Sequence, residues 1–345
     1  MTNECQLAIC CGPIVTTWNC SSDAKGDTNT ASFAPRSDNT PVVDVSWNSS
    51  GQVLASCLSL ENSKTDNVFF SSTSQNAKLL DSFRHDAGLK RPTTNTCTPK
   101  PGIDAKATCI SFGVKSRYLV VGDDCGTVCL WDIKKRSRVR HYFHPNQHHA
   151  SLQATLDPTD SNVLSLSEKA FYIFRLREAT LAASISETKS RLTRYSTSSL
   201  EPRHVAIGTG IGSLNVYDMA LQSRVLSMSL HTGSITGVQY SAVNKLLLAS
   251  ASTDATLCFS DIATGNMVQS MSLESPATSM SFHKNGYTCA VGTDTGKVLV
   301  YDLRNPSEMV ASYQGDGKVL AVHFAPNTAS KPRHSTSSTT SNAME

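Results

Sequence analysis

One structural unit occurs twice in succession between residues 234 and 303. Each copy begins with a strand of alternating polar and apolar residues, followed by a small polar turn and a nearly continuous apolar run that forms the second strand. A turn that contains an acidic residue comes next, and the third strand then ends in a dipeptide whose second residue is Asp. The first strands are predicted at 235–240 and 278–282, and the turn acids are Asp254 and Asp294. A fourth, more polar strand closes each copy. Because such a unit cannot bury its faces alone, its repetition predicts the blades of a β-propeller.

The ending of the third strand recurs along the chain with a regular period. It falls at Trp131-Asp132, Phe174-Arg175, Tyr217-Asp218, Ser260-Asp261 and Tyr301-Asp302, and the steps between the second residues are 43, 43, 43 and 41. This spacing lies within the ~40–45 residues typical of WD repeats. Only one unit has a literal Trp-Asp, so the period rather than the motif carries the prediction.

The first blade lacks an innermost strand. Residues 5–10 and 14–19 predict two strands joined at Gly12-Pro13, and no strand precedes them. The missing strand is predicted at 318–324 (KVLAVHF), where it pairs with the N-terminal strands and closes the ring. Further units are predicted at 42–83, 107–132, 152–185 and 192–228. Together these features predict an all-β fold, a seven-bladed WD40 β-propeller.

The predicted domain organisation is simple. The propeller is expected to span residues 1–326 and to carry a loop insertion at about 85–104, where three prolines interrupt any apolar periodicity. Residues 327–345 are rich in Ser and Thr and poor in apolar residues, so we expect a disordered tail.

The composition argues against several classes of protein. No apolar run approaches the ~18 residues that a membrane span requires, and residues 1–11 lack the pattern of a signal peptide. We therefore expect a cytoplasmic protein with no membrane partner. The net charge of +3 is too small and too spread out to favour nucleic acid as a partner. The eleven cysteines form no two paired C-x-x-C spacings, which favours buried free thiols over disulfides or zinc ligands.

No pattern for catalysis is present in the sequence. It contains no G-x-S-x-G, no Walker loop and no H-E-x-x-H, so it is predicted not to be an enzyme and to need no cofactor. His231 and Asp254 are placed like the histidine and the turn acid that bond to each other within a WD blade. Partner binding is expected around His231, Asp254 and Asp294, on the loop face that includes the turns before strands one and three. The alternative is that His231 and Asp254 are purely structural.

The most basic run of the chain, KKRSRVRH at residues 134–141, gives a second candidate surface. It would suit an acidic partner or nucleic acid, or it is a solvated turn and an outer strand whose charges deter edge pairing. Its candidate partner-binding residues are Lys134, Lys135, Arg136, Arg138 and Arg140. The three histidines of the following loop, residues 144–149, are expected to be exposed to solvent rather than to bind metal.

The second half of the chain resembles one family of WD-repeat adaptors. The segments that carry the resemblance are residues 231–271 (HTGSITGVQYSAVNKLLLASASTDATLCFSDIATGNMVQSM), 276–306 (PATSMSFHKNGYTCAVGTDTGKVLVYDLRNP) and 319–324 (VLAVHF). Residues 43–48 (VDVSWN) and 126–133 (GTVCLWDI) also lie where similar segments occur. The family is that of the neural precursor cell expressed developmentally down-regulated adaptor, which attaches the γ-tubulin ring complex to centrosomes and spindles.

This resemblance implies a protein-interaction scaffold that supports microtubule nucleation and assembly of the mitotic spindle. In that family the propeller directs the adaptor to centrosome or spindle partners, and a helical region after it grips γ-tubulin complexes. The present sequence has no heptad or helical segment after the ring, so localisation through the propeller is the safer expectation. The alternatives are a substrate receptor of a ubiquitin ligase and a scaffold of an RNA-processing assembly.

Overall fold

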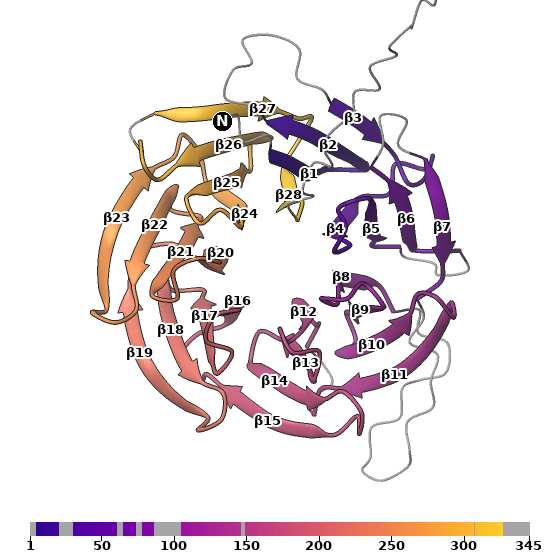
Figure 1. Cartoon of the computed structure of the whole chain (residues 1–345), viewed down its shortest axis with the longest axis horizontal. Coiled ribbons are helices and arrows are strands. Elements are labelled where there is room, and N and C mark those ends of the chain that lie inside the picture. The colour runs from indigo at the N-terminus through magenta and orange to yellow at the C-terminus, as the bar shows by residue number, and fades with distance from the viewer. Residues whose placement is uncertain are drawn as a thin grey trace, which may run out of the picture.

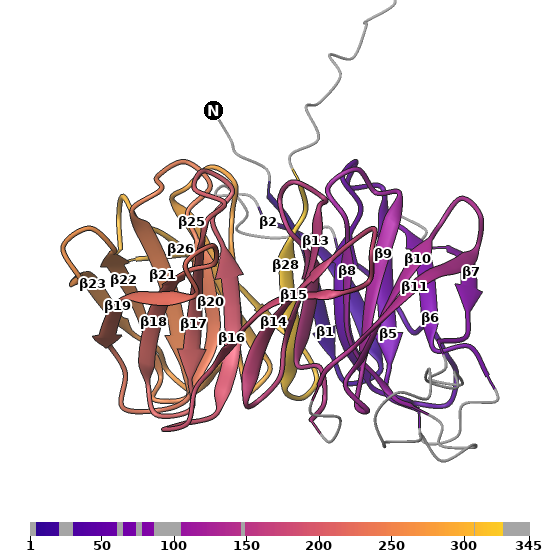
Figure 2. The ribbon, with the colours of Figure 1, turned by 90° about the horizontal axis from the view of Figure 1, so that it is seen from below.

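A computed structural model describes residues 5–20, 30–60, 65–73, 78–85, 105–145, 149–306 and 308–326. Within these residues the chain forms seven four-stranded antiparallel sheets arranged as blades around a central axis (Figure 1). Seen edge-on, the strands run between two faces that carry the connections (Figure 2). The predicted seven-bladed propeller is therefore confirmed. The predicted insertion, apart from His85, and the predicted tail lie outside the described residues.

The strands follow the predicted units closely. Blade one contains β28 (Val319–Phe324), β1 (Cys5–Cys11), β2 (Ile14–Cys20) and β3 (Thr30–Phe33) from the axis outward. Blade two has β4 (Val42–Trp47), β5 (Val53–Leu58), β6 (Val68–Ser72) and β7 (Leu79–Phe83). Blade three has β8 (Ala107–Phe112), β9 (Tyr118–Asp123), β10 (Thr127–Asp132) and β11 (Ser137–Phe143). Blade four has β12 (Gln153–Leu156), β13 (Asn162–Leu166), β14 (Ala170–Arg175) and β15 (Leu181–Ser186).

The last three blades repeat the same order. Blade five has β16 (Leu192–Thr197), β17 (His204–Thr209), β18 (Ser213–Asp218) and β19 (Ser223–Ser229). Blade six has β20 (Ile235–Tyr240), β21 (Leu247–Ser252), β22 (Thr256–Asp261) and β23 (Asn266–Ser272). Blade seven has β24 (Ala277–Phe282), β25 (Thr288–Thr293), β26 (Lys297–Asp302) and β27 (Met309–Gln314).

The ring is closed by the two ends of the propeller. β28 pairs antiparallel with β1, so that Leu7 faces Phe324 and Ile9 faces Val322, and the amide of Ala325 donates to the carbonyl of Gln6 at 2.8 Å. Closure removes two open sheet edges that would otherwise accept another chain. The predicted pairing of the C-terminal strand is confirmed.

Side chains link the inner strands of neighbouring blades, which belong to separate hydrogen-bonded sheets. The hydroxyl of Thr236 in β20 donates to the carbonyl of Ala277 in β24 at 2.9 Å, and Thr278 in β24 donates to Val319 in β28 at 2.7 Å. Each bridge satisfies a carbonyl beside the central axis, where an unpaired buried group would be costly. The hydroxyl groups of the inner strands thereby fix the spacing of the blades.

The outer strands are protected by a recurring irregularity. In blades two to seven the register between the third and fourth strands shifts by one residue, which leaves an extra residue on the outer strand. Such a β-bulge increases the local twist and turns the open edge away from another chain. The extra residues, all exposed, are Leu80, Val139, Ala182, Val225, Val268 and Val310.

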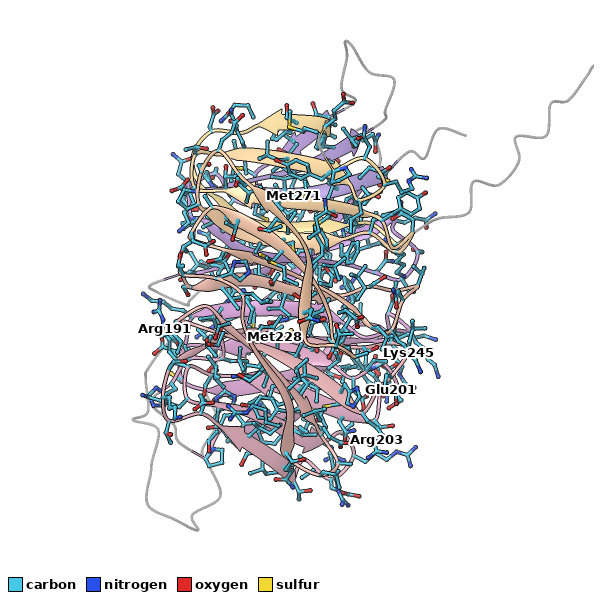
Figure 3. All side chains as sticks on the ribbon, turned by 90° about the vertical axis from the view of Figure 1, so that its left-hand side faces the viewer. Arg191, Glu201, Arg203, Met228, Lys245 and Met271 are labelled. Atoms are coloured by element: carbon cyan, nitrogen blue, oxygen red, sulfur yellow. The ribbon has the colours of Figure 1, made fainter. Side chains whose placement is uncertain are left out.

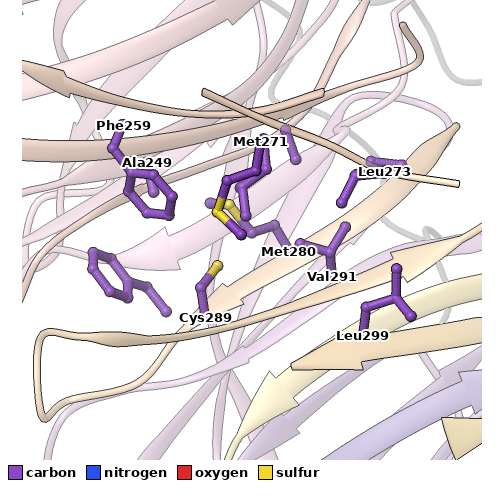
Figure 4. Packing of buried hydrophobic residues seen from close by; sticks show 12 residues of the cluster. Ala249, Phe259, Met271, Leu273, Met280, Cys289, Val291 and Leu299 are labelled. Atoms are coloured by element: carbon purple, nitrogen blue, oxygen red, sulfur yellow. The ribbon is translucent and has the colours of Figure 1, made fainter. Parts of the chain in front are cut away.

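The apolar core lies between the blades. Between blades six and seven, Phe259 of β22 and Met271 of β23 pack against Met280 and Cys289 of the next blade, and none of the four is more than 8% exposed (Figure 4). Burial of a side chain such as Phe259 contributes roughly 1.5–3 kcal/mol. Among the described residues all ten cysteines are unpaired and all but Cys125 are buried, as the sequence predicts.

Candidate interaction surfaces

The alternation of the strands divides the connections between two faces. Because neighbouring strands in a blade are antiparallel, the segment before the first strand and the turn between strands two and three lie on one face, here called the top face. The other turns lie on the bottom face. Figure 3 shows the division from the side: Arg191, before β16, lies on one side, and Glu201, Arg203 and Lys245 lie on the other.

His231 lies on the top face of blade six but is turned into the protein. Its side chain is buried, with Nε2 2.8 Å from the hydroxyl of Ser250 and Nδ1 2.7 Å from the hydroxyl of Thr256. Thr256 donates its own proton to Asp254 at 2.6 Å, so its oxygen accepts from Nδ1–H of His231. Burial lowers the pKa of His231 against the opposing attraction of Asp254, which favours the neutral ring.

Asp254 completes this network from the turn between β21 and β22. Its carboxylate accepts the amide of Thr232 at 2.8 Å and the amide of Thr256 at 3.1 Å. Burial alone would raise its pKa, but these bonds and the hydroxyl of Thr256 lower it to about 2. Since the side chain is only 11% exposed, Asp254 ties together the strands of its blade and presents little surface to a partner.

Asp294 occupies the corresponding turn of blade seven at a different position. Gly292 pairs with Val298 as Ala251 pairs with Leu257, so Asp294 corresponds to Thr253, and Thr295 corresponds to Asp254. Asp294 is exposed, and no hydrogen bond of its carboxylate is found among the described residues. Of the three candidates on the top face, Asp294 alone offers a solvent-facing charge.

The basic candidates lie elsewhere on the molecule. Lys134 and Lys135 are exposed in the turn between β10 and β11, on the bottom face, and Arg136 in the same turn is 3.1 Å from Asp81 of blade two. The remaining two, Arg138 and Arg140, lie on the outer strand β11. The turn of the basic run and Asp294 therefore lie on opposite faces of the ring, and they belong to two separate surfaces.

The guanidinium groups of the run differ in exposure. The guanidinium of Arg138 lies 5.7 Å from the ring centre of Trp131, which half-buries it against the blade. Arg140 is exposed. The turn and outer strand expected for this run are confirmed, and its role in binding stays a prediction.

Blade four contains a second structural histidine, which was not expected from the sequence. His144 was expected to be exposed, but it is completely buried, with Nε2 2.8 Å from the hydroxyl of Ser165 and its ring 4.4 Å from that of Tyr172. The expectation was wrong because His144 occupies in blade four the place of His231 in blade six. The spacing in the sequence could have identified this histidine. His144 precedes Arg175, at the end of the third strand of its blade, by 31 residues, and His231 precedes the corresponding Asp261 by 30.

The surface also has a shallow hollow on the top face. It measures about 410 Å³ and is lined by residues from the turns of blade two and from the approach to blade three, namely Thr40, Pro41, Ser59, Leu60 and Lys106. No helix in the described part of the chain is long and apolar enough to cross a membrane.

Comparisons with known proteins agree with this architecture. Residues 155–341 match the model of the nucleolar protein 10-like N-terminal domain, and residues 99–132 match the WD domain, G-beta repeat. A chain in a crystal structure of the mitotic checkpoint complex has a TM-score of 0.67 and 15% identity, and the similarity covers 82% of this chain and 80% of that one.

Two curated relatives are similar over most of the ring. Human protein NEDD1 is 24% identical over 239 residues, which are 66% of this chain and 36% of the relative. Rice pre-mRNA-processing factor 19 is 22% identical over 68% of this chain and 46% of the relative. The chain thus spans about a third of the length of NEDD1 and less than half that of the rice protein. The family model of the nucleolar protein 10-like N-terminal domain matches more than half of the sequence. The chain is therefore a NEDD1-like WD-repeat propeller that belongs to the nucleolar protein 10-like N-terminal domain family.

Proposed function

We propose that the propeller is a non-enzymatic scaffold that brings the γ-tubulin ring complex to centrosomes and spindles. The observation that carries the proposal is the similarity to NEDD1 across two thirds of the chain, which is the resemblance first visible in the sequence. The geometry supports a binding role, because a closed ring with buried blade interfaces holds its turns in fixed positions. Centrosome or spindle is the corresponding location.

Two exposed surfaces are the candidate docking sites within this proposal. The first is the top face around Asp294, with His231 and Asp254 as supports of the neighbouring connections in blade six. The second is the basic surface of Lys134, Lys135, Arg136, Arg138 and Arg140. A cluster of cations with a half-buried arginine suits a partner with acidic side chains, because charge complementarity speeds association and selects the partner.

The test is affinity purification of the tagged chain from dividing cells, probed for γ-tubulin and for spindle proteins. The double variant Lys134→Glu and Lys135→Glu and the single variant Asp294→Lys are compared with Lys245→Glu, an exposed lysine on the bottom face of blade six. We expect spindle proteins in the unmodified eluate and a loss of at least fivefold in one of the first two variants only. Retention of every partner in all variants would eliminate both surfaces.

A second candidate function is a scaffold subunit of a nucleolar or RNA-processing assembly. The family model named for nucleolar protein 10 and the similarity to a pre-mRNA-processing factor favour it. The same purification separates the two, because this alternative predicts ribosome-assembly or splicing proteins in the eluate and a nucleolar or nuclear position of the tagged chain. Recovery of cullin proteins would instead favour a substrate receptor of a ubiquitin ligase.

A further inference from the structure

The interior of blade three departs from the histidine network of blade six. His85 occupies in blade three the place of His231, but Val121 stands where the hydroxyl of Ser250 donates to Nε2 of His231, and Cys125 stands where Asp254 lies. The ring of His85 is fully buried, and neither of its nitrogens has a hydrogen-bond partner among the described residues. A buried imidazole without hydrogen bonds is costly unless another group satisfies it.

A carboxylate of the same blade faces this ring. Asp123 is fully buried, and its Oδ1 accepts the amides of Cys125 and Thr127 at 3.0 and 2.7 Å. Its Oδ2 makes no hydrogen bond within the part of the chain that the structure describes and lies 3.8 Å from Nε2 of His85. Two buried groups thus point at each other across a gap too long for a hydrogen bond.

The adjoining turn adds two more donor groups. A ligand atom from each of Asp123, Asp124 and Cys125 lies within 4.8 Å of the others, and Cys125 Sγ is 3.6 Å from Asp124 Oδ1. His85 is not one of this group of three and adjoins it through Asp123. In a tetrahedral zinc site with bonds of about 2.0–2.3 Å, neighbouring donor atoms lie roughly 3.3–3.8 Å apart. Both measured separations, the second being His85 to Asp123, fall in that range.

We propose that the turn between β9 and β10 binds a divalent transition-metal ion of the zinc class. Asp123 and His85 form the buried half of the site and are held in place by the blade. Asp124 and Cys125 form the accessible half and turn inward to complete it. Imidazole, thiolate and carboxylate are the donors that zinc accepts, and a set with one thiolate and one imidazole disfavours magnesium and calcium.

The position of the site gives the ion a structural role. The amide and carbonyl of His85 are both bound by the side chain of Asn67, and the amide of Lys106 donates to Asp124 at 2.9 Å. His85 and Lys106 are the described residues that flank, with Ala105, the segment 86–104. A bound ion would therefore join both flanks of this segment to one turn of blade three.

The experiment uses the full chain, stripped with a chelator and titrated with Co²⁺ and then with Zn²⁺. We expect a near-ultraviolet thiolate-to-cobalt charge-transfer band that saturates at one ion per chain, displacement by Zn²⁺, and a rise in melting temperature. Cys125→Ser removes the band without loss of fold, because Cys125 is partly exposed. Asp124→Asn weakens Co²⁺ binding at least tenfold.

The matched control lies in blade seven, where the turn reads Gly292-Thr-Asp294-Thr-Gly296 in place of Gly-Asp-Asp-Cys-Gly. Asp294→Asn removes an exposed carboxylate at the position of Asp124 and should leave binding unchanged. The proposal fails if the unmodified chain gives neither band nor thermal shift. It also fails if the band survives Cys125→Ser, because another of the cysteines would then be the ligand, or if Asp294→Asn weakens binding as much as Asp124→Asn.

Discussion

Two acids on the top face differ at the scale of single residues. Asp254 binds Thr232 and Thr256, whereas the carboxylate of Asp294 faces solvent. We expect Asp254→Ala to lower the free energy of unfolding by about 1–3 kcal/mol, because it leaves partly buried donors unpaired. Asp294→Ala should change it by less than about 0.5 kcal/mol. Urea unfolding measures both, and equal losses would show that the network contributes nothing.

Two of the buried histidines, His144 and His231, predict a pH dependence of stability. Burial lowers the pKa of His144 to about 4, whereas the unfolded residue titrates near 6.5, so unfolding takes up a proton between these values. The contribution is fully present above pH 6.5 and is lost as pH falls toward 4, by at most about 3 kcal/mol. His231 acts in the same direction. Chemical unfolding at pH 7, 5.5 and 4.5 tests this.

The matched comparison for that prediction is His144→Asn. This variant loses the bond to Ser165 and is less stable at every pH. Its stability should nevertheless decline less steeply between pH 6.5 and 4.5, because one titrating group has been removed. An unchanged slope would mean that His144 is already protonated in the folded protein.

At the scale of elements, the connections of the top face depend on glycine in unequal degrees. Gly212 has a φ of +81°, and a Cβ there would lie 2.0 Å from the carbonyl oxygen of His231. Gly317, before β28, has a φ of +90° but open space around it. We expect Gly212→Ala to cost more than about 3 kcal/mol and Gly317→Ala about 1–2 kcal/mol, the cost of backbone strain alone. Thermal melts of the two variants measure the difference.

The strands were predictable from the sequence because each has a short apolar run at a fixed distance from the next. The bulges of the outer strands were not, since the extra residue, such as Val268, looks like any other β-branched strand residue. The candidate site was predicted only in part. The sequence paired His231 with Asp254 correctly, but the register that sets Asp294 one position earlier emerges only when Gly292 is seen to pair with Val298.

At the scale of the whole molecule, the pairing of β28 with β1 predicts how truncation acts. Removal of residues 318–345 should lower the melting temperature by more than 10 °C, roughly the effect of a few kcal/mol on a chain of this size. It exposes the inner edge of β1 and takes Val319 and Val322 out of the buried cluster that they form with Leu7 and Ile9. Removal of 327–345 alone should leave the melting temperature within about 2 °C. A melt of the shorter chain that matches the full chain would show that the ring is stable when open.

The same pairing sets an order of events during synthesis. β1 and β2 leave the ribosome before the other strands of the ring, yet the inner edge of their sheet stays unpaired until Phe324 has emerged, more than three hundred residues later. At about 5–20 residues per second this wait lasts tens of seconds, during which an apolar strand edge is open to other nascent chains. The first blade is therefore the last to gain its full set of four strands.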